Sequence, residues 1–298
     1  MEIIFLGTSQ AIPTKKRNHT SILLNYKNEN ILIDCGEGTQ RQFRKLKINP
    51  CKLTRILITH WHGDHVLGLP GLFQTLELNN YSKILNIYGP KGTKKYIKQI
   101  EKLFVHKGKI KMNINEVKGE FLDTENFKII SSELNHNTPC NGYSFIEKDK
   151  FKIIKSKLKK LKISKEERKK IKLLTQGKNI KIKNKTINYK DLTTIKKGKK
   201  ISFILDTKKC NNINKLAKDS DLLIIESTYS NKEKELASEY KHMTAEQAGK
   251  IAKQNNVKKL ILTHISQRYE NKESIILKEA KKYFKNTKIA EDFMKVEI

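Results

Sequence analysis

Directly after the apolar segment Arg55–Ile58, the chain reads Thr-His-Trp-His-Gly-Asp-His. Three of its eight histidines and one aspartate fall within six consecutive residues, 60–65. The preceding segment has the length and branched side chains of a buried strand, so His60 lies at a strand end and the other three polar residues lie on the loop that follows. Gly63 permits a tight turn in that loop. Four ligand-type side chains here need partners from elsewhere, which predicts a fold that gathers several strand ends.

Short apolar segments rich in Ile and Leu recur along the whole chain and predict strands of buried sheets. The strands arrive in runs in the first half, and helices are interspersed later. This order favours an α/β (α+β) fold of two sheets with helices outside over a single doubly wound sheet. At 298 residues the chain is long enough for such a core. Helices are expected at residues 39–47, 66–78, 93–104, 244–255 and 274–285.

Three further polar residues close strand-like segments, namely His136, Asp206 and His264. Each of them alone could be a capping or satisfied core residue, but together with the cluster at 60–65 they indicate one shared site. Histidine nitrogens and carboxylate oxygens suit zinc, and this number of ligands suits two metal ions. The alternative, a solvated histidine-rich loop, leaves four potential ligands within six consecutive residues unexplained.

The chain is strongly basic, with 62 Lys and Arg against 31 Asp and Glu, a formal net charge of +31. A genomic bias toward Lys, Ile and Asn explains part of this charge. It does not explain the segment 148–200, which holds 22 basic and four acidic residues, a net of +18. We therefore expect a core domain of residues 1–147 and 201–298, and a lysine-rich insertion, 148–200, that projects as an arm and binds a polyanion.

Within the insertion, a capping box of Ser164 and Glu167 predicts the start of a helix that ends at Gly177. Alternating apolar and polar residues further on predict a hairpin that turns at Asn184–Lys185. The insertion is nearly free of aromatic residues, whereas proteins that bind single strands usually stack bases on aromatic rings. Its composition therefore favours contact with the backbone phosphates of folded, duplex RNA.

The four cysteines are scattered and form no C-x-x-C pair, which favours a reducing compartment. No segment has the length and apolar character of a signal peptide or a membrane span. We therefore expect a cytoplasmic protein with no membrane partner.

The sequence His-Trp-His-Gly-Asp-His, with Leu-Ile-Asp-Cys-Gly-Glu-Gly upstream, resembles the HxHxDH signature of the metallo-β-lactamase superfamily. The resemblance implies an αβ/βα sandwich that holds two zinc ions per subunit. It also implies that Asp34 lies behind the site and orients a ligand. The ligand roles that it implies are His60, His62 and His136 for one ion, Asp64, His65 and His264 for the other, and Asp206 as the bridge between both.

Narrower features resemble the ribonuclease Z family over essentially the whole chain. Pro13, Lys15, Arg17 and Asn18 match its P-x-K-x-R-N loop, and the resemblance implies that the last three bind substrate. The sequence Gly-Glu-Gly-Thr-Gln-Arg-Gln is also typical of the family, and His242 lies where the family carries a histidine beside the scissile phosphate. The basic insertion stands where many members carry an arm that grips tRNA, but it lacks their Gly-Pro-rich tip, since it contains no proline.

This resemblance implies a zinc-dependent endoribonuclease that removes 3′ trailers from precursor tRNA, cutting after the discriminator base to leave a 3′ hydroxyl. Asp64 would act as the general base, and His242 would neutralise a phosphate oxygen or protonate the leaving oxygen. The alternative for His242 is a surface histidine in front of a helix capped by Thr244. The resemblance also implies a homodimer, in which the arm of one subunit holds the RNA that the other cleaves.

Two other classes of function fit part of the sequence. A small-molecule ester, thioester or phosphodiester hydrolase of the same fold would use the metal site but would not need an arm of net charge +18. A non-catalytic RNA-binding module would use the arm but would not need every ligand position to be filled. A longer nuclease that acts on messenger RNA would require an inserted cap domain, for which 298 residues leave little room.

Overall fold

The computed structural model describes residues 1–103, 110–159, 161, 167–182 and 185–298. It contains two compact units. The first comprises Met1–Leu122, Ile129–Phe145 and Lys200–Ile298, and the second comprises Asp123–Lys128 and Ile146–Lys199.

The first unit holds two seven-stranded sheets. In the first sheet the order is β18-β1-β2-β3-β4-β5-β6, with antiparallel pairs as far as β3 and parallel pairs from β3 to β6. The carboxyl ends of β3, β4 and β5 therefore lie at one edge of this sheet. The strands are β1 (Glu2–Gly7), β2 (Ser21–Tyr26), β3 (Glu29–Ile33), β4 (Arg55–Leu57), β5 (Ile84–Gly89), β6 (Lys111–Glu116) and β18 (Lys295–Glu297).

The second sheet has the order β17-β16-β15-β14-β9-β8-β7, and its strands from β14 to β17 are parallel. Their carboxyl ends also share one edge. The strands are β7 (Gly119–Asp123), β8 (Phe127–Glu133), β9 (Asn141–Glu147), β14 (Lys200–Ile204), β15 (Leu222–Glu226), β16 (Leu260–Thr263) and β17 (Thr287–Ile289).

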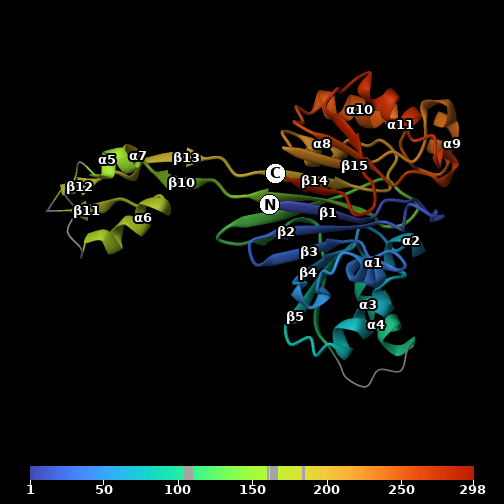
Figure 1. The fold of residues 1–298 in the computed structure, drawn as a ribbon, viewed down its shortest axis with the longest axis horizontal. Helices are drawn as coiled ribbons and strands as arrows, with labels where there is room; N and C mark the ends of the chain where they lie inside the picture. The colour runs from blue at the N-terminus through green and yellow to red at the C-terminus, as the bar shows by residue number, and fades with distance from the viewer. Residues whose placement is uncertain (104–109, 160, 162–166, 183–184) are drawn as a thin grey trace. The chain divides into compact units, whose positions relative to one another are not determined.

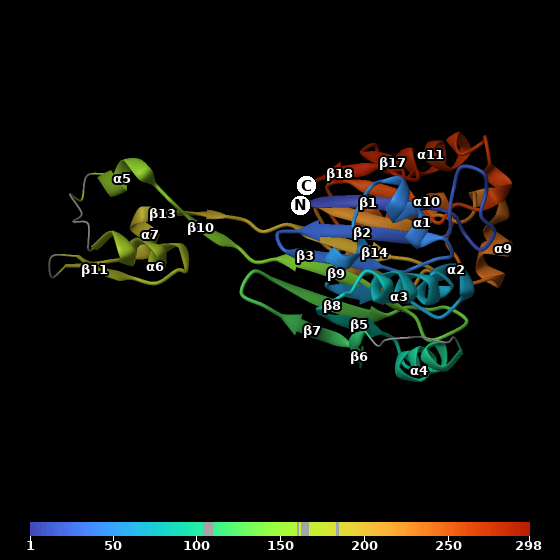
Figure 2. The ribbon, with the colours of Figure 1, turned by 60° about the horizontal axis from the view of Figure 1, so that its bottom comes forward.

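Helices cover the outer face of each sheet, so the first unit is a helix–sheet–sheet–helix sandwich (Figures 1 and 2). The predicted α/β fold of two sheets with helices outside is confirmed. Among the described residues, no helix is long and apolar enough to cross a membrane. The helices on the first sheet are α1 (Thr39–Lys45), α3 (Leu69–Leu78) and α4 (Thr93–Leu103), and those on the second are α8 (Asn212–Ala217), α10 (Ala245–Gln254) and α11 (Ser274–Lys281).

Strand β1 shows why the sequence reads as continuous apolar runs. Ile4 and Leu6 pack with the helices outside the first sheet. Ile3 and Phe5 alternate with them and therefore face the other sheet, and both are 0% exposed. Because both faces of the strand are covered, no polar position is needed in between.

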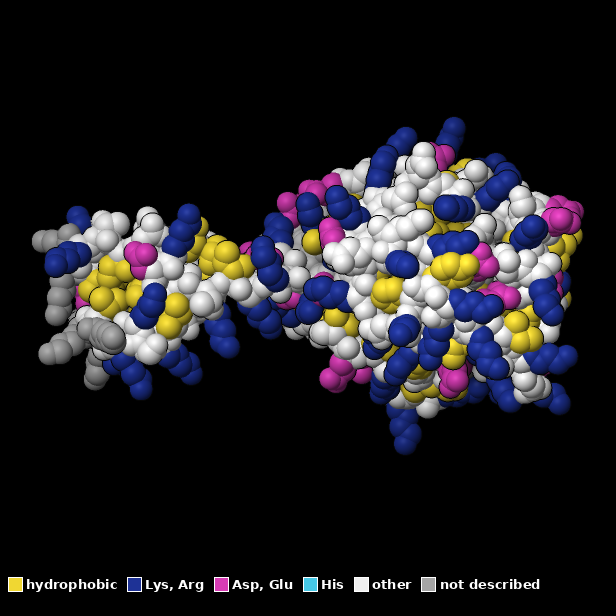
Figure 3. All heavy atoms as spheres, turned by 90° about the horizontal axis from the view of Figure 1, so that it is seen from above, with side chains coloured by type: hydrophobic (Ala, Val, Ile, Leu, Met, Phe, Trp, Pro, Cys, Tyr) yellow, Lys and Arg dark blue, Asp and Glu magenta, His cyan; other side chains and the backbone are white. Residues whose placement is uncertain are grey.

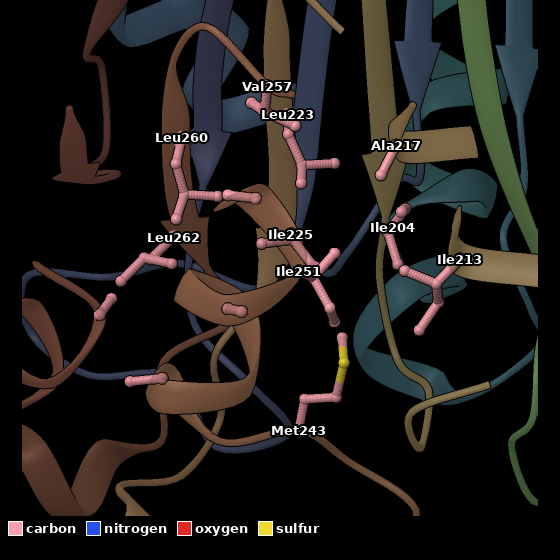
Figure 4. Close-up of a cluster of buried hydrophobic side chains, with 14 of the residues drawn as sticks. Ile204, Ile213, Ala217, Leu223, Ile225, Met243, Ile251, Val257, Leu260 and Leu262 are labelled. Atoms are coloured by element: carbon pink, nitrogen blue, oxygen red, sulfur yellow. The ribbon is translucent and has the colours of Figure 1, made fainter. Parts of the chain in front are cut away.

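The helix-side core of the second sheet reaches the loop before α10. Met243 belongs to this core and is 0% exposed, which fixes the position of the neighbouring His242. Figure 4 shows side chains of this core, with Ile204, Leu223, Ile225, Leu260 and Leu262 from β14–β16, Ile213, Ala217 and Ile251 from the helices, and Met243 from the loop.

The helix predicted at 66–78 is α3 (Leu69–Leu78), which begins three residues later than expected, and a separate short helix, α2 (Gly63–Val66), precedes it. Asp64 and His65, predicted on a loop, therefore lie in a helical turn, and that prediction was wrong. Pro70 explains the break, because proline lacks an N–H and fits the first turn of a new helix better than the interior of a longer one.

Sequence reasoning missed the edge strands β6 and β7. Both are exposed or half-buried throughout, and neither has a continuous run of more than two apolar side chains. An edge strand needs no continuous apolar run, because water satisfies one side of it. Pairing with a neighbour, and not composition, makes these segments strands.

The second unit has a small core formed by Leu174, Ile180, Ile182 and Leu192. Figure 3 shows Lys and Arg side chains spread over both units on the face in view. The elements of this unit are the paired strands β10 (Lys150–Ile153) and β13 (Thr193–Lys196), the paired strands β11 (Ile180–Ile182) and β12 (Lys185–Ile187), and the helices α5 (Lys155–Lys159), α6 (Ile171–Thr175) and α7 (Tyr189–Leu192).

The predicted helix end at Gly177 is confirmed. Gly177 has φ +74°, and the N–H groups of Gly177 and Lys178 donate to the carbonyls of Leu174 and Leu173, which is the Schellman arrangement. The predicted hairpin exists, but Lys185 pairs with Ile182 inside it, so placing Lys185 in the turn was wrong. Asn184, and Ser164 of the predicted capping box, lie outside the described residues.

Candidate metal centre

The predicted ligands come from segments that follow β4, β8, β14 and β16, all in the first unit. His264 directly follows β16, as expected. Asp206 is the second residue after β14, and His60 and His136 are the third residues after β4 and β8. Short loops thus carry three of the four beyond the strand ends, toward one point between the sheets.

One ligand set consists of His60, His62, His136 and Asp206, whose candidate ligand atoms all lie within 4.8 Å of one another. His62 Nδ1 lies 3.1 Å from His60 Nε2 and 3.2 Å from His136 Nε2. Asp206 Oδ2 lies 3.6 Å from His60 Nε2. Three imidazole nitrogens and one carboxylate oxygen therefore face one another across a space of the size of a single metal ion.

The second set consists of Asp64, His65, His264 and the same Asp206. His65 Nε2 lies 3.4 Å from Asp64 Oδ2 and 3.3 Å from Asp206 Oδ1. His264 Nε2 lies 3.4 Å and 3.1 Å from these two oxygens. Ligands about 2.1 Å from a tetrahedral zinc ion are about 3.4 Å apart, so the spacing fits zinc. Asp206 contributes one oxygen to each set.

Asp34 orients His65 from behind, as the resemblance implied. His65 Nδ1 donates to Asp34 Oδ2 over 2.6 Å, which leaves His65 Nε2 to face the ligand set. Thr59 holds the carboxylate in place, because its N–H donates to Oδ1 and its hydroxyl donates to Oδ2. Asp34 has φ +56°, a conformation costly for a non-glycine residue, and these three bonds stabilise it.

Two threonines orient two more histidines by the same device. Thr59, whose hydroxyl donates to Asp34, accepts from His60 Nδ1 over 3.1 Å. Thr228 donates to a carboxylate, Glu226 Oε2, and accepts from His264 Nδ1 over 2.9 Å. In each case the outer ring nitrogen carries the proton, so the lone pair of Nε2 points into the site. His136 Nδ1 likewise donates to a carbonyl, that of Lys241.

The charges of the site call for a cation. Burial lowers the pKa of His60, His62 and His136, so these three rings are neutral and fit to bind metal. Although burial also lowers the pKa of His65, the carboxylates of Asp206, Asp64 and Asp34 raise it well above the usual range. Three carboxylates therefore converge on one buried imidazole.

Asp206 is the residue with the strongest need for a metal. It is 2% exposed, and among the residues that the structure describes its buried Oδ1 has no hydrogen-bond partner. Burial raises the pKa of this carboxyl, but the neighbouring rings of His264 and His65 hold it well below the usual range, so it is ionised. A buried, ionised oxygen without a donor is costly unless a cation satisfies it. The residues present therefore fit two bridged metal ions.

Glu226 is a site residue that sequence reasoning missed. It is the last residue of β15, so it carried the same strand-end signal as the predicted ligands. Its buried carboxylate accepts hydrogen bonds from Thr207 N, Thr228 Oγ1, Met243 N and His242 Nδ1. It thereby links the orientation of His264 to that of His242.

His242 is buried beside the ligand sets and is not a surface residue. It is 8% exposed, and its ring stacks on that of His264 with the centroids 5.4 Å apart. Burial lowers the pKa of His242, but the Glu226 carboxylate outweighs this and raises it to about 9. The ring is therefore protonated at neutral pH. Thr244 caps α10 directly after it, as expected.

The loop of Lys15, Arg17 and Asn18 is anchored beside the strand end that carries His264. Lys15 is exposed, whereas Arg17 is 7% exposed and donates to Thr8 Oγ1 and to the carbonyl of Ala290. Asn18 donates through its side chain to the carbonyl of Glu37. Lys15 thus faces solvent, while the other two hold the loop in shape, and substrate binding by the three stays a prediction.

Solved structures with the same fold identify the class. The metallo-β-lactamase fold protein YhfI from Bacillus subtilis superposes with a TM-score of 0.69 at 18% identity, over 100% of this chain and 99% of that one. Human tRNase Z, short form, superposes with a TM-score of 0.73 at 28% identity, also over 100% and 99% of the two chains. The chain is therefore a metallo-β-lactamase fold protein.

Sequence relatives identify the family. Ribonuclease Z of Methanothermobacter thermautotrophicus is 38% identical, over 100% of this chain and 97% of the relative. Ribonuclease Z of Nanoarchaeum equitans is 39% identical, over 99% of this chain and 92% of the relative. A family model described as anti-Pycsar protein Apyc1 matches residues 1–124. The chain belongs to the ribonuclease Z family, which confirms the resemblance seen in the sequence.

Proposed function

We propose that this ribonuclease Z removes 3′ trailers from precursor tRNA with the help of two zinc ions, and that it cuts after the discriminator base to leave a 3′ hydroxyl. The observation that carries the proposal is the pair of ligand sets joined by Asp206, with the protonated ring of His242 packed against them. Family membership supports the choice of RNA over a small ester as the substrate.

His60, His62 and His136 would hold one zinc ion, and Asp64, His65 and His264 the other, with Asp206 between them. When bound, the two ions would supply a water nucleophile at neutral pH and neutralise charge on the scissile phosphate. Two observations support this assignment. The rings of His60, His62 and His136 are neutral, and the buried Asp206 Oδ1 has no hydrogen-bond partner among the described residues.

Asp64 acts as the general base. Burial raises the pKa of its carboxyl, but the neighbouring rings of His65 and His264 outweigh this and lower it, so the group is ionised at neutral pH. Its Oδ2 faces the second ligand set. This leaves Oδ1 to orient the attacking water and to take its proton.

His242 acts as the general acid. Its Nδ1 donates to Glu226, so Nε2 is the nitrogen that can present a proton to the leaving 3′ oxygen. The Glu226 carboxylate keeps this ring protonated and in a fixed orientation. The leaving oxygen then departs as the neutral hydroxyl that further maturation of the tRNA end requires.

The lysine-rich segment 148–200 acts as the RNA-binding arm. Its aromatic residues Phe151 and Tyr189 are half-buried and pack against each other with ring centroids 4.7 Å apart, so they offer no stacking platform to bases. Its lysines suit the backbone phosphates of a folded RNA. We also propose, from family resemblance, that the protein acts as a homodimer in the cytoplasm.

The test is incubation of zinc-loaded protein with a precursor tRNA that carries a 3′ trailer, with product ends mapped to the nucleotide. We expect one cut after the discriminator base. The matched control is Asp64→Ala, which should bind the same RNA but not cut it. Cleavage of a small ester or thioester with no cut in the RNA would refute the proposal, and normal cutting by Asp64→Ala would refute the site.

A further inference from the structure

Helix α4 presents a basic face that none of the proposed roles uses. Lys94, Lys95, Lys98 and Lys102 are all exposed and, together with Gln99, line a groove of about 430 Å³ along the helix. The opposite face of the helix packs on the first sheet through Ile97, which is 0% exposed. The lysines thus lie on the outer side of a helix held firmly by its apolar side, and their charge suits a polyanion.

This helix is fastened to the metal-binding segment itself. Trp61 lies between two candidate ligands, His60 and His62, and its indole N–H donates to Thr93 Oγ1, at the first residue of α4, over 3.0 Å. The Trp61 ring also packs on Tyr96 with the centroids 4.9 Å apart. In addition, α4 follows β5, the parallel neighbour of β4, so its first turn begins at the edge where the candidate metal ligands gather (Figure 2).

Tyr96 adds an aromatic surface to the lysines. It is 39% exposed although Trp61 supports one part of its ring, and Lys95 Nζ lies 6.0 Å from the ring centroid. An exposed ring with one lysine beside it, on a helix whose outer side carries further lysines, is a combination that can bind single-stranded RNA, because the ring stacks on a base while the lysines follow the backbone. The segment 148–200, by contrast, has lysines without an exposed ring.

The side chains of α4, and not its N-terminus, would bind the anion. Glu116 Oε1 accepts from the N–H groups of Gly92 and Lys94 and so already occupies the helix end. The groove lined by the lysines is the remaining electropositive feature of this helix.

We propose that Tyr96 and the lysine face of α4 bind the single-stranded 3′ trailer as it leaves the metal centre. This inference rests on the proposed function, since the trailer exists only in a precursor tRNA. An unstacked strand suits Tyr96, whereas the paired acceptor stem offers no free base to an aromatic ring. The trailer is the unpaired strand that begins at the scissile phosphate, and α4 begins at the edge where that phosphate is held.

The test compares two precursors of one tRNA, with a trailer of one nucleotide and with an unstructured trailer of about ten nucleotides, long enough to follow the helix. The variant Lys98→Glu/Lys102→Glu should lose activity, as kcat/KM, on the long trailer by about tenfold or more and change little on the short one. The matched control, Lys278→Glu/Lys282→Glu, makes the same charge change with the same spacing on exposed positions of α11 and its C-cap. It should treat both precursors as the wild type does.

Tyr96→Ala should lower kcat/KM for the long trailer by about 5- to 100-fold, and Tyr96→Phe should keep it, because stacking needs the ring and not the hydroxyl. In the lysine variant, the salt dependence of long-trailer binding should become less steep by about 0.7 for each trailer phosphate that is no longer neutralised. Equal decreases on both precursors, or no decrease on either, would overturn the inference while the proposed function stands. A wild type that cuts neither precursor would instead refute the proposed function.

Discussion

Asp206 is the residue on which both ligand sets depend. It gives Oδ2 to the set of His60 and His136 and Oδ1 to the set of His65 and His264. Because each oxygen faces two imidazole nitrogens, the carboxylate balances both sites and fixes the distance between them.

Asp206→Asn should therefore weaken metal binding at both positions and abolish RNA cleavage. The amide has no charge and only one acceptor oxygen, so it cannot serve two cations. The metal content per subunit, measured by mass spectrometry after dialysis, should fall well below that of His136→Ala, which disturbs one set only. Retention of the wild-type metal content by Asp206→Asn would contradict the bridging role.

Glu226 and His242 should behave as one functional unit. His242→Ala should lower kcat by about 100-fold or more, since general acid catalysis contributes typically 10²- to 10⁴-fold. Glu226→Gln should lower kcat as well, because the ring loses the carboxylate that raises its pKa to about 9. The double variant should be about as slow as His242→Ala alone.

The double-mutant cycle, measured on single-turnover cleavage, checks this coupling. Melting temperatures of all three variants control for the other hydrogen bonds that Glu226 accepts, from Thr207, Thr228 and Met243. Fully additive effects would show that the two side chains act separately.

At the residue scale, the sequence singled out the candidate ligands that the structure brings together, because their types are unusual and their spacing is local or follows strands. Glu226 was missed although it also ends a strand, because a single glutamate carries no motif of its own. The interior position of Arg17 was equally hidden, since burial of a charged side chain depends on partners such as Ala290 and Thr8, which lie elsewhere in the chain.

At the element scale, the junction between α2 and α3 sets the position of Asp64 and His65. It packs directly on the loop after β3, where Gly68 N donates to the carbonyl of Cys35 and Cys35 N donates to the carbonyl of His65. The backbone of Gly68 approaches so closely that an added Cβ would lie 2.1 Å from the Gly36 carbonyl oxygen and 2.8 Å from that of Cys35.

Gly68→Ala should therefore destabilise the fold by about 1–3 kcal/mol and lower the metal content. The carbonyl oxygens of Gly36 and Cys35 cannot move away from the added Cβ without displacing the candidate metal ligands. Thermal unfolding and metal analysis measure the two effects. Gly63→Ala is the matched control in the same segment, since its Cβ would meet only the flexible side chain of Leu67, at 3.0 Å. A Gly68→Ala protein as stable and as metal-rich as the wild type would contradict this account.

Strands such as β1 and β15 could be predicted from the sequence because both of their faces are buried. In these strands the apolar residues are consecutive, so a short stretch of sequence is enough to indicate that the strand is buried. The edge strands β6 and β7 depend instead on pairing with a neighbouring strand, so composition alone did not indicate them. The strand-end pattern succeeded because parallel strands bring their carboxyl ends together in any fold of this kind.

At the scale of the whole molecule, the candidate metal centre and the densest group of lysines lie in different units. The candidate metal centre lies entirely in the first unit, whereas the second unit has a small apolar core and a dense set of lysines. The pairing of β10 with β13 places Lys150 opposite Lys196. The chain therefore enters and leaves the segment 151–195 at two neighbouring positions.

This pairing defines a deletion that should remove RNA binding without disturbing the metal centre. Replacing residues 151–195 by an Asn-Gly turn joins Lys150 to Lys196 across the distance of one strand pair, and Asn-Gly suits such a turn. The shortened protein should hydrolyse a small chromogenic phosphodiester as the wild type does, because its ligands are untouched. Its KM for precursor tRNA should rise by about tenfold or more, and the salt dependence of binding should become less steep, because fewer lysines neutralise RNA phosphates. If hydrolysis of the small diester also failed while zinc remained bound, the second unit would contribute to the chemistry itself, and the division between the two units would be wrong.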